Sequence, residues 1–285
     1  MACPCYEPPF NAGRRRRAVP PPPRPVPLHH VESGDAKGLA VVLLHGFPYD
    51  GRMWKGAAQA LANAGYRAIV PDLRGFGKSA VQPTASMQEM AADVAALLEA
   101  QKVRRAVVLG FSMGGYVALQ MAIRHAEQVA GLALIDTRAE EDTPTARAAR
   151  MDLIARVERQ GMAPIIEGQL PKQTSAYSKQ HRPGVAKELE QLMQSQDPKG
   201  AIAALRGMAE RPDVRSRLAG LGLACLVVNG EEDPVIPLDD AIRLAQHFRG
   251  SSFEAIPKTA HAAPLEDPER FHKVLLSWLK ESFVA

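Results

Sequence analysis

The chain has 285 residues, of which 46% are hydrophobic and 23% are charged, and its formal net charge at pH 7 is +4. A chain of this length buries about three-quarters of its unfolded surface around one core, so the composition indicates a single large globular domain. Polar residues, glycine or proline interrupt every apolar stretch within roughly ten residues, which is too short for a membrane-spanning helix. These properties exclude a membrane-spanning protein.

The excess positive charge lies at the N-terminal end of the chain. The first thirty residues contain five arginines and one acidic residue, which leaves residues 31–285 without net charge. Because a neutral domain does not attract a phosphate backbone, we expect no nucleic-acid partner. Cysteines are few, and Cys225 lies in an apolar run, so we expect no disulfide framework and a reducing compartment.

Residues 1–27 form a tail that is rich in proline and arginine. The segment has nine prolines and too few aliphatic residues to offset the entropy of ordering, so we predict that it is disordered. Its arginine run resembles the start of an export signal, but Pro20–Pro23 stand where such a signal needs an apolar stretch. We therefore expect a cytoplasmic protein. The tail is interpreted as an uninformative extension or an upstream start, with a proline-rich docking motif as the alternative.

From Val31 onward, short apolar runs alternate with amphipathic helical stretches. Strands that are buried on both faces and joined by crossover helices produce this pattern, which predicts an α/β fold with a mostly parallel sheet. In chain order, the predicted elements are strand 39–44, helix 51–64, strand 67–70, helix 87–101, strand 106–109, helix 114–124, strand 132–135, strand 224–228, helix 238–248, strand 252–256 and helix 268–283.

One long interval breaks this alternation. From Thr137 to about Arg215 there is helical pattern and no strand-like run. The first helix of this interval is predicted to begin at Thr143-Pro144 and to end at Gly161. We therefore divide the chain into a tail (1–27), a core (28–136 and 216–285) and an inserted helical cap (137–215).

The strongest local signal is the run Gly110-Phe111-Ser112-Met113-Gly114-Gly115, which follows a predicted strand and opens a predicted helix. In a sharp strand-to-helix turn the central residue is strained, and small residues two positions away prevent a collision. The turn would expose the Ser112 hydroxyl at the positive end of a helix, which favours anionic intermediates. Ser112 is therefore the predicted nucleophile, and a merely flexible turn is the alternative.

A serine nucleophile needs a general base, and the chain has eight histidines. His261 is the predicted base, because it lies in a polar loop between the last predicted strand and helix with small alanines on both sides. The remaining histidines are assigned to the border of the tail, to helices, to the cap or to a turn: His29, His30, His125, His247, His272, His181 and His45.

Two aspartates are candidates for the acid that orients the base. Asp233 follows strand 224–228 and precedes His261, which gives the chain order serine, acid, histidine. Asp136 also ends a strand, and its alternative roles are a helix cap or a hinge residue where the cap begins. Chain order and strand position favour Asp233.

Acyl transfer also needs hydrogen-bond donors for the oxygen that becomes negative. The predicted donors are the backbone amides of Met113, directly after the nucleophile, and of Phe47, in the loop after strand 39–44, where a plain tight turn is the alternative. The predicted substrate-binding residues are apolar: Phe47, Trp54, Phe111, Met113 and Ile154. Simple packing of the cap on the core is the alternative for them. No metal cluster, phosphate loop or dinucleotide fingerprint accompanies them, so we expect no metal and no cofactor.

These motifs resemble those of the α/β-hydrolase fold superfamily, in particular its serine esterases and its enol-lactonase-like branch. The resemblance covers about Leu28–Val284 and rests on residues 45–48, 71–79, 110–115, 230–234 and His261. It implies an eight-stranded, mostly parallel sheet with a cap after the sixth strand, and structural roles for Asp72 and Arg74. The family usually begins with a hairpin of two strands, but here only residues 28–32 have strand character, so the first edge strand is expected to be missing.

Motifs and resemblance together predict a cofactor-independent serine hydrolase that cleaves a small carboxylic ester or lactone. Ser112 attacks the carbonyl, His261 transfers the proton, Asp233 orients His261, and water releases the acyl group. Among enzymes, the alternatives are a cofactor-free perhydrolase and a carbon–carbon bond hydrolase. Outside enzymes, the alternative is a ligand-binding receptor with this fold. Acyl chain length, stereochemistry and oligomeric state stay open.

Overall fold

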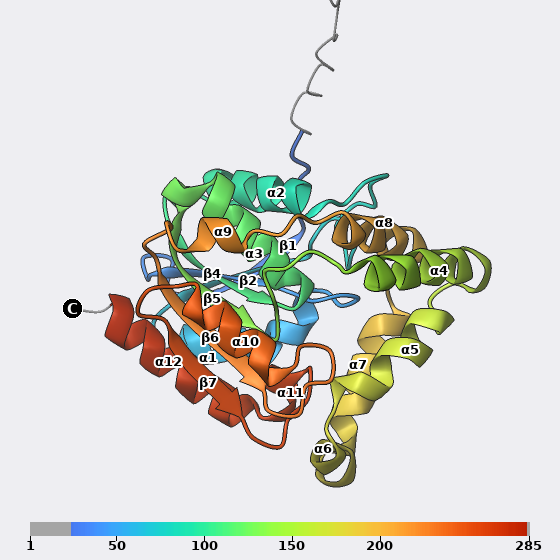
Figure 1. Ribbon diagram of the computed structural model, residues 1–285. Helices are drawn as coiled ribbons and strands as arrows, with labels where there is room; N and C mark the ends of the chain where they lie inside the picture. Colours follow the sequence, from blue (N-terminus) through green and yellow to red (C-terminus); the bar gives the residue numbers. More distant parts are fainter. Residues whose placement is uncertain (1–23, 284–285) are drawn as a thin grey trace, which may run out of the picture.

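The computed structural model describes residues 24–283, which form a central sheet with helices on both of its faces (Figure 1). In the described residues the sheet has seven strands: β1 (His30–Gly34), β2 (Ala40–Leu44), β3 (Arg67–Pro71), β4 (Ala106–Phe111), β5 (Val129–Ile135), β6 (Ala224–Gly230) and β7 (Ser252–Ile256). Their order is β1-β3-β2-β4-β5-β6-β7, and only the β1–β3 pair is antiparallel. This arrangement confirms the predicted fold class, with β1 as the edge strand of the described sheet.

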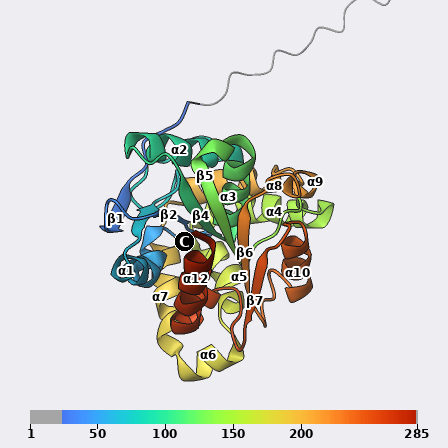
Figure 2. The same ribbon diagram turned by 90° about the vertical axis from the view of Figure 1, so that its left-hand side faces the viewer.

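Helices cover both faces of the sheet, which explains why the central strands are apolar along their whole length. Every residue of β2 and β4 is buried. The helices α2 (Met87–Ala100) and α3 (Met113–Arg124) lie on one face, and α1 (Lys55–Asn63) and α12 (Pro268–Phe283) lie on the other (Figure 2). The helix α10 (Leu238–Gln246) connects β6 to β7, and the short helix α11 (Ala263–Glu266) precedes α12.

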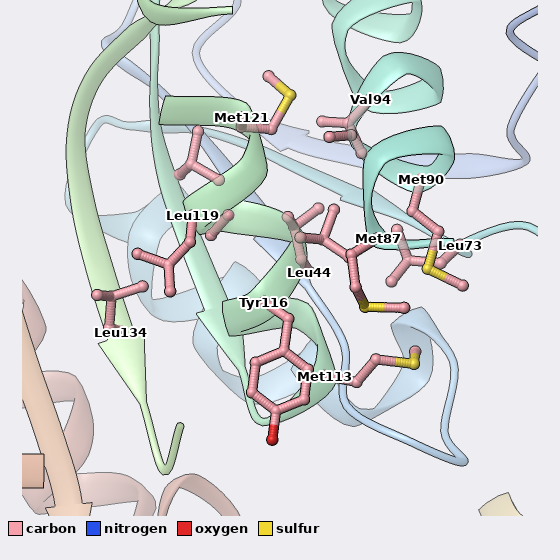
Figure 3. Packing of buried hydrophobic residues seen from close by; sticks show 14 of the residues in the cluster. Leu44, Leu73, Met87, Met90, Val94, Met113, Tyr116, Leu119, Met121 and Leu134 are labelled. Carbon is pink, nitrogen blue, oxygen red and sulfur yellow. The ribbon is translucent and has the colours of Figure 1, made fainter. Parts of the chain in front are cut away.

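A methionine-rich cluster fills the space between the sheet and the pair α2 and α3 (Figure 3). Met87 and Met90 of α2 and Met113 of α3 have no exposed surface there, and Leu44 at the end of β2 belongs to the same cluster. A capping box fixes the start of α2, because Ser86 accepts a hydrogen bond from the backbone of Glu89 and the Glu89 side chain accepts one from the backbone of Ser86. The cluster therefore joins α2, α3 and the end of β2.

The long interval between β5 and β6 is helical, as expected. It contains α4 (Pro144–Gln160), α5 (Ala163–Gln173), α6 (Ala176–His181), α7 (Pro183–Gln194), α8 (Pro198–Ala209) and α9 (Arg215–Leu218). Thr143 caps α4 by accepting a hydrogen bond from the amide of Ala146, and Gly161 ends the helix with a φ of 65°. In Figure 1 the helices α4 to α8 lie to one side of the sheet. The short helix α9 contributes Leu218 to the same hydrophobic cluster as α3.

Several predicted elements differ in their bounds from the observed ones, and two of these differences concern where the element begins. The predicted helix 51–64 begins as a 3₁₀ turn, η1 (Gly51–Trp54), because the Asp50 side chain accepts a hydrogen bond from the amide of Arg52 and tightens the start. Strand β5 begins at Val129, three residues before the predicted start, and includes Gly131. A side chain at this glycine would lie 2.5 Å from the ring of Phe283 in α12, so the glycine allows the helix to pack closely.

The end of the predicted tail contacts the core. Residues 1–23 lie outside the described residues, so their disorder stays a prediction. Val26 packs against the hydrophobic core, and its backbone N–H donates to Asp93 Oδ1 at 2.8 Å. The prediction that the disordered tail extends to residue 27 is therefore wrong at its end, because a buried carboxylate binds this part of the backbone.

The described helices also bear on membrane insertion. In residues 24–283, no helix combines the length and the apolar character that crossing a membrane requires.

Candidate active site

Ser112 lies in a sharp turn between β4 and α3. Its φ of 50° and ψ of −112° are strained for a residue with a side chain. A side chain at Gly110 would lie 2.3 Å from the carbonyl oxygen of Gly114, and one at Gly114 would lie 2.3 Å from the carbonyl oxygen of Leu44. The two glycines therefore allow the close approach of strand, turn and helix that leaves the Ser112 side chain partly exposed at the start of α3.

The structure brings Ser112, His261 and Asp233 together. Ser112 Oγ lies 2.9 Å from His261 Nε2, and His261 Nδ1 lies 2.8 Å from Asp233 Oδ2. An ionised carboxylate can only accept hydrogen bonds, so the Nδ1–H of His261 donates to Asp233 and Nε2 accepts from the serine hydroxyl. The side chains of His261 and Asp233 are buried, and hydrogen bonds are stronger there than in water.

The backbone that follows Asp233 fixes the position of its carboxylate. Asp233 Oδ1 accepts hydrogen bonds from the amides of Val235 at 2.7 Å and Ile236 at 3.1 Å. The other oxygen, Oδ2, is thereby left for His261. The acid is held in place on one side and bound to the imidazole on the other.

Asp136, the second candidate acid, makes no hydrogen bond to His261. Its Oδ1 accepts from the amide of Gly230 at 2.7 Å, and its Oδ2 has no hydrogen-bond partner in residues 24–283. Burial and the nearby charge of Asp233 raise the pKa of Asp136 well above its usual range. Asp136 therefore makes no direct hydrogen bond to His261, and its carboxyl connects the end of β5 to the end of β6.

The turn after β2 packs against the Ser112 turn. His45 Nδ1 donates to the carbonyl oxygen of Gly46 at 2.9 Å, and Nε2 accepts from the amide of Leu73 at 2.9 Å. Burial lowers the pKa of His45, which agrees with a neutral ring that donates at one nitrogen and accepts at the other. A side chain at Gly46 would lie 2.5 Å from the ring of Phe111, so the two turns are in close contact.

Two backbone amides at this junction have the properties expected of oxyanion donors. Met113 is the first residue of α3, where a helix leaves its N–H groups without intrahelical acceptors. The N–H of Phe47 belongs to the turn that packs on Phe111. Neither amide donates a hydrogen bond to another group in the described part of the chain. Their role as oxyanion donors stays a prediction.

The five predicted substrate-binding residues differ in exposure. Phe47 is half-buried, and its ring meets that of Phe76 edge-on with 6.1 Å between the centroids. Met113 and Ile154 are buried in the cluster between the sheet, α2, α3 and the cap. Phe47 therefore has a side chain with accessible surface, whereas the burial of Met113 and Ile154 agrees with the packing alternative.

Phe111 and Trp54 form an aromatic layer behind His261. The ring of Phe111 lies 5.1 Å from that of His261, and Trp54 meets Phe111 edge-on at 6.3 Å. Trp54 also stacks on Phe271 of α12, and it is 1% exposed. Trp54 therefore lies in the core and is connected to His261 through the ring of Phe111, which again agrees with packing rather than with direct substrate contact.

Asp72 and Arg74 hold the loop that follows β3. Asp72 accepts hydrogen bonds from the amides of Gly51 at 2.8 Å and Lys78 at 2.9 Å. The guanidinium of Arg74 binds both oxygens of Asp93, at 2.6 and 2.7 Å, in the interior. These contacts agree with the structural roles that the resemblance implied.

Two polar residues beside His261 were missed at the sequence level. Glu266 Oε1 accepts a hydrogen bond from the amide of Ala260 at 2.5 Å, and the carbonyl oxygen of Gln173 accepts one from the amide of Ala262 at 2.9 Å. Neither residue belongs to a recognisable motif, because both bind backbone groups that any sequence supplies. The available signal was an acidic residue directly after the apolar stretch 262–265.

Side chains that could bind a metal do not gather in the described part of the chain. Residues 24–283 contain no group of three or more histidine, cysteine or acidic side chains that could hold a metal ion. Cys225 is a free cysteine inside the core, where burial raises the pKa of its thiol.

The comparisons with known proteins agree with this geometry. The sequence pattern of the family described as alpha/beta hydrolase fold matches residues 40–268. A thermophilic esterase from Thermogutta terrifontis has a similar structure, with a TM-score of 0.87 and 38% identity, covering 90% of this chain and 93% of that one. The 3-oxoadipate enol-lactonase 1 of Acinetobacter baylyi is 27% identical over 248 residues, covering 87% of this chain and 91% of the relative. The pimeloyl-[acyl-carrier protein] methyl ester esterase of Aeromonas hydrophila is 29% identical over 259 residues, covering 84% of this chain and 94% of the relative. The chain belongs to the α/β-hydrolase fold family.

Proposed function

We propose that the protein is a cofactor-independent serine hydrolase that cleaves small carboxylic esters or lactones through an acyl-enzyme intermediate. The observation that carries this proposal is the pair of hydrogen bonds that connects Ser112 Oγ to His261 Nε2 and His261 Nδ1 to Asp233. A serine hydroxyl becomes a useful nucleophile when a base accepts its proton and a third group holds that base. The names of the esterase and enol-lactonase relatives support the ester or lactone class.

In the proposed first step, Ser112 Oγ attacks the carbonyl carbon and His261 Nε2 takes the hydroxyl proton. The carbonyl oxygen becomes negative and accepts hydrogen bonds from the amides of Phe47 and Met113. When the carbon–oxygen bond to the leaving group breaks, the imidazolium returns its proton to the departing alkoxide. Asp233 stabilises the imidazolium while it is charged.

In the second step, water attacks the acyl-enzyme carbonyl. His261 accepts a proton from the water and then gives it to Ser112 Oγ as the carboxylic acid leaves. A lactone would follow the same course, but the alcohol formed in the first step would stay attached to the acyl group. Phe47 is the apolar side chain that we propose for contact with the substrate, because it is partly exposed beside the proposed oxyanion site.

The test combines a substrate panel with labelling of the nucleophile. p-Nitrophenyl esters of increasing acyl length and simple lactones should be hydrolysed by the wild-type protein, and the change in rate with acyl length would report the depth of the pocket. A fluorophosphonate should add once per chain, at Ser112, as shown by intact mass and peptide mapping. Ser112→Ala should lose turnover by about a million-fold.

Three outcomes would contradict the proposal or one of its parts. Labelling at another residue, or a Ser112→Ala variant that keeps more than about a thousandth of the wild-type turnover, would reject Ser112 as the nucleophile. Faster formation of peracid from acetate and hydrogen peroxide than hydrolysis of any ester would instead support the perhydrolase alternative. Ligand binding without turnover of any substrate would support a receptor.

A further inference from the structure

The loop that carries His261 is held on both sides by one segment of the cap. This segment, Gln173–Ser175, connects α5 to α6. Before the histidine, Ser175 Oγ donates to the carbonyl oxygen of Lys258 at 2.7 Å. After it, the amide of Ala262 donates to the carbonyl oxygen of Gln173 at 2.9 Å. Residues at the ends of the cap segment thus bind the backbone on either side of the base.

Glu266 of α11 adds a bridge between the same loop and the same cap segment. Its Oε1 accepts from the amide of Ala260 at 2.5 Å, and its Oε2 accepts from the amide of Ser175 at 2.7 Å. The side chain has no exposed surface. A carboxylate can accept on both oxygens at once, whereas an amide side chain has one oxygen acceptor only. Glu266 is therefore suited to join two backbone N–H groups in the interior.

The cap segment also contacts the turn that carries the proposed oxyanion donor. Tyr49 OH donates to Gln173 Oε1 at 2.8 Å, and both side chains are buried. The amide of Tyr49 donates in turn to the carbonyl oxygen of Gly46, which closes the turn around Phe47. One cap residue therefore binds the base loop through its backbone and the oxyanion turn through its side chain.

The segment is buried where it contacts the His261 loop. Gln173, Thr174 and Ser175 are 1%, 3% and 4% exposed, although all three are polar. The Thr174 hydroxyl has no hydrogen-bond partner in residues 24–283, but the groups of Gln173 and Ser175 that bind the His261 loop and Glu266 are paired, and moving the segment away would leave them without partners. This end of the cap is therefore attached to the loop and does not act as a free lid.

We propose that Glu266 and the cap segment Gln173–Ser175 are positioning elements that hold His261 at hydrogen-bond distance from Ser112. The cap then determines the geometry of the base as well as covering the core. This inference rests on the proposed function, because it assigns a reaction step to His261. A displacement of about 1 Å in a reacting group can lower a rate about a hundred-fold, so small changes in the loop should be visible in turnover.

The experiment compares variants of these contacts with a matched change elsewhere in the cap. Glu266→Gln keeps the size of the side chain but removes one acceptor. Ser175→Ala removes the bond to Lys258 and also the cap of α6, where Ser175 Oγ accepts from the amide of Ser178 at 3.1 Å. The control is Ser195→Ala, which removes a cap hydroxyl that accepts a hydrogen bond from Arg52 and does not contact the His261 loop. All are measured in the full chain, well below the melting temperature of each variant.

The readouts are kcat, KM and the second-order rate of fluorophosphonate addition at Ser112. For Glu266→Gln we expect kcat and the labelling rate to fall by the same factor, about 10 to 100, with KM within about two-fold of wild type. Ser175→Ala should show the same pattern with a loss of several-fold. Ser195→Ala should match the wild type in all three readouts. If Glu266→Gln does not fold, Ser175→Ala alone carries the test.

Several results would overturn the inference. Wild-type kcat and labelling in both variants, together with an inactive Ser112→Ala, would reject the positioning role and leave the proposed function intact. A rise in KM at unchanged kcat would assign the segment to substrate binding instead. A loss of kcat that equals the loss of folded protein would show a purely structural role. An active Ser112→Ala would reject the proposed function itself.

Discussion

Asp136 and Asp233 lie just beyond the neighbouring strands β5 and β6, and their carboxyl groups face different partners. Asp233 binds His261 Nδ1 at 2.8 Å, whereas Asp136 accepts from the amide of Gly230 at 2.7 Å. The charge of Asp233 contributes to the raised pKa of Asp136, so the two groups also interact electrostatically. The different partners of the two carboxyls and the raised pKa of Asp136 lead to two of the predictions below.

The first prediction concerns the acid that orients the base. Asp233→Asn should fold normally but lose turnover by about ten-thousand-fold, because an amide cannot hold His261 in the form that accepts the serine proton. Asp136→Asn should lose far less, since Asp136 makes no hydrogen bond to His261. Turnover numbers with matched thermal melts test this pair. An inactive Asp136→Asn beside an active Asp233→Asn would reverse the assignment.

The second prediction concerns the pH dependence of stability at Asp136. A carboxyl whose pKa is raised by folding binds more protons in the folded state, so its contribution to stability decreases as pH rises above the pKa of the unfolded chain. Asp136→Asn removes this contribution and keeps an acceptor for the amide of Gly230. The free energy of unfolding of Asp136→Asn minus that of the wild type should therefore increase as pH rises from about 4, which is the usual pKa of an aspartate, toward neutral pH. Urea unfolding at several pH values measures this difference, and a constant or declining difference would show that Asp136 is ionised in the folded protein.

The third prediction concerns the contact between the turn after β2, which carries Phe47, and the Ser112 turn. In Gly46→Ala the new methyl group would lie 2.5 Å from the ring of Phe111, which packs against His261. Overpacking of this kind lowers stability by about 1 to 3 kcal/mol, and the displaced ring should lower kcat/KM at least about ten-fold. The control is Gly168→Ala in α5, where nothing lies within 4 Å. It should be neutral or stabilising by up to about 1 kcal/mol. Equal effects of the two substitutions in urea unfolding and kinetics would reject the contact.

The fourth prediction concerns the interior ion pair of Arg74. Arg74→Ala leaves the buried carboxylate of Asp93 without its guanidinium partner, so the free energy of unfolding should fall by about 3 to 5 kcal/mol. Turnover per site that reacts with fluorophosphonate should stay at the wild-type level, because Arg74 holds a loop and does not touch the triad. Arg206→Ala, which breaks an exposed pair with Glu158, should cost less than about 1 kcal/mol. A loss of turnover in the fully folded Arg74→Ala protein would contradict the structural role.

Features that depend on neighbouring residues could be predicted from the sequence. The apolar runs identified the strands of the parallel sheet, and Thr143-Pro144 and Gly161 marked the ends of α4. The glycines around Ser112 identified the strained turn, because backbone strain and close packing there restrict the allowed residue types directly. Local propensities, caps and turn geometry act over a few residues, so a single sequence displays them.

Long-range features were decided by the tertiary structure. The order of residues favoured Asp233 over Asp136, but only the packing of β5, β6 and the His261 loop shows which carboxyl reaches the imidazole. The sequence analysis placed Val26 in the disordered tail, which was incorrect, and it left open whether Trp54 contacts substrate or packs in the core. Both answers depend on contacts with residues that are distant in the sequence.

Glu266 and Gln173 show most clearly where sequence-based prediction stops. Both bind backbone amides of the His261 loop. Gln173 also binds Tyr49, which lies 124 residues earlier in the chain. Its other partner, Ala262, lies after β6 and β7. Any residue supplies a backbone N–H, so such a contact leaves no pattern in the sequence of the loop. The apolar pattern of the sequence determined which segments enter the core. The pairing of buried polar groups with distant backbone was decided by the tertiary structure, because each buried donor must find its acceptor in three dimensions.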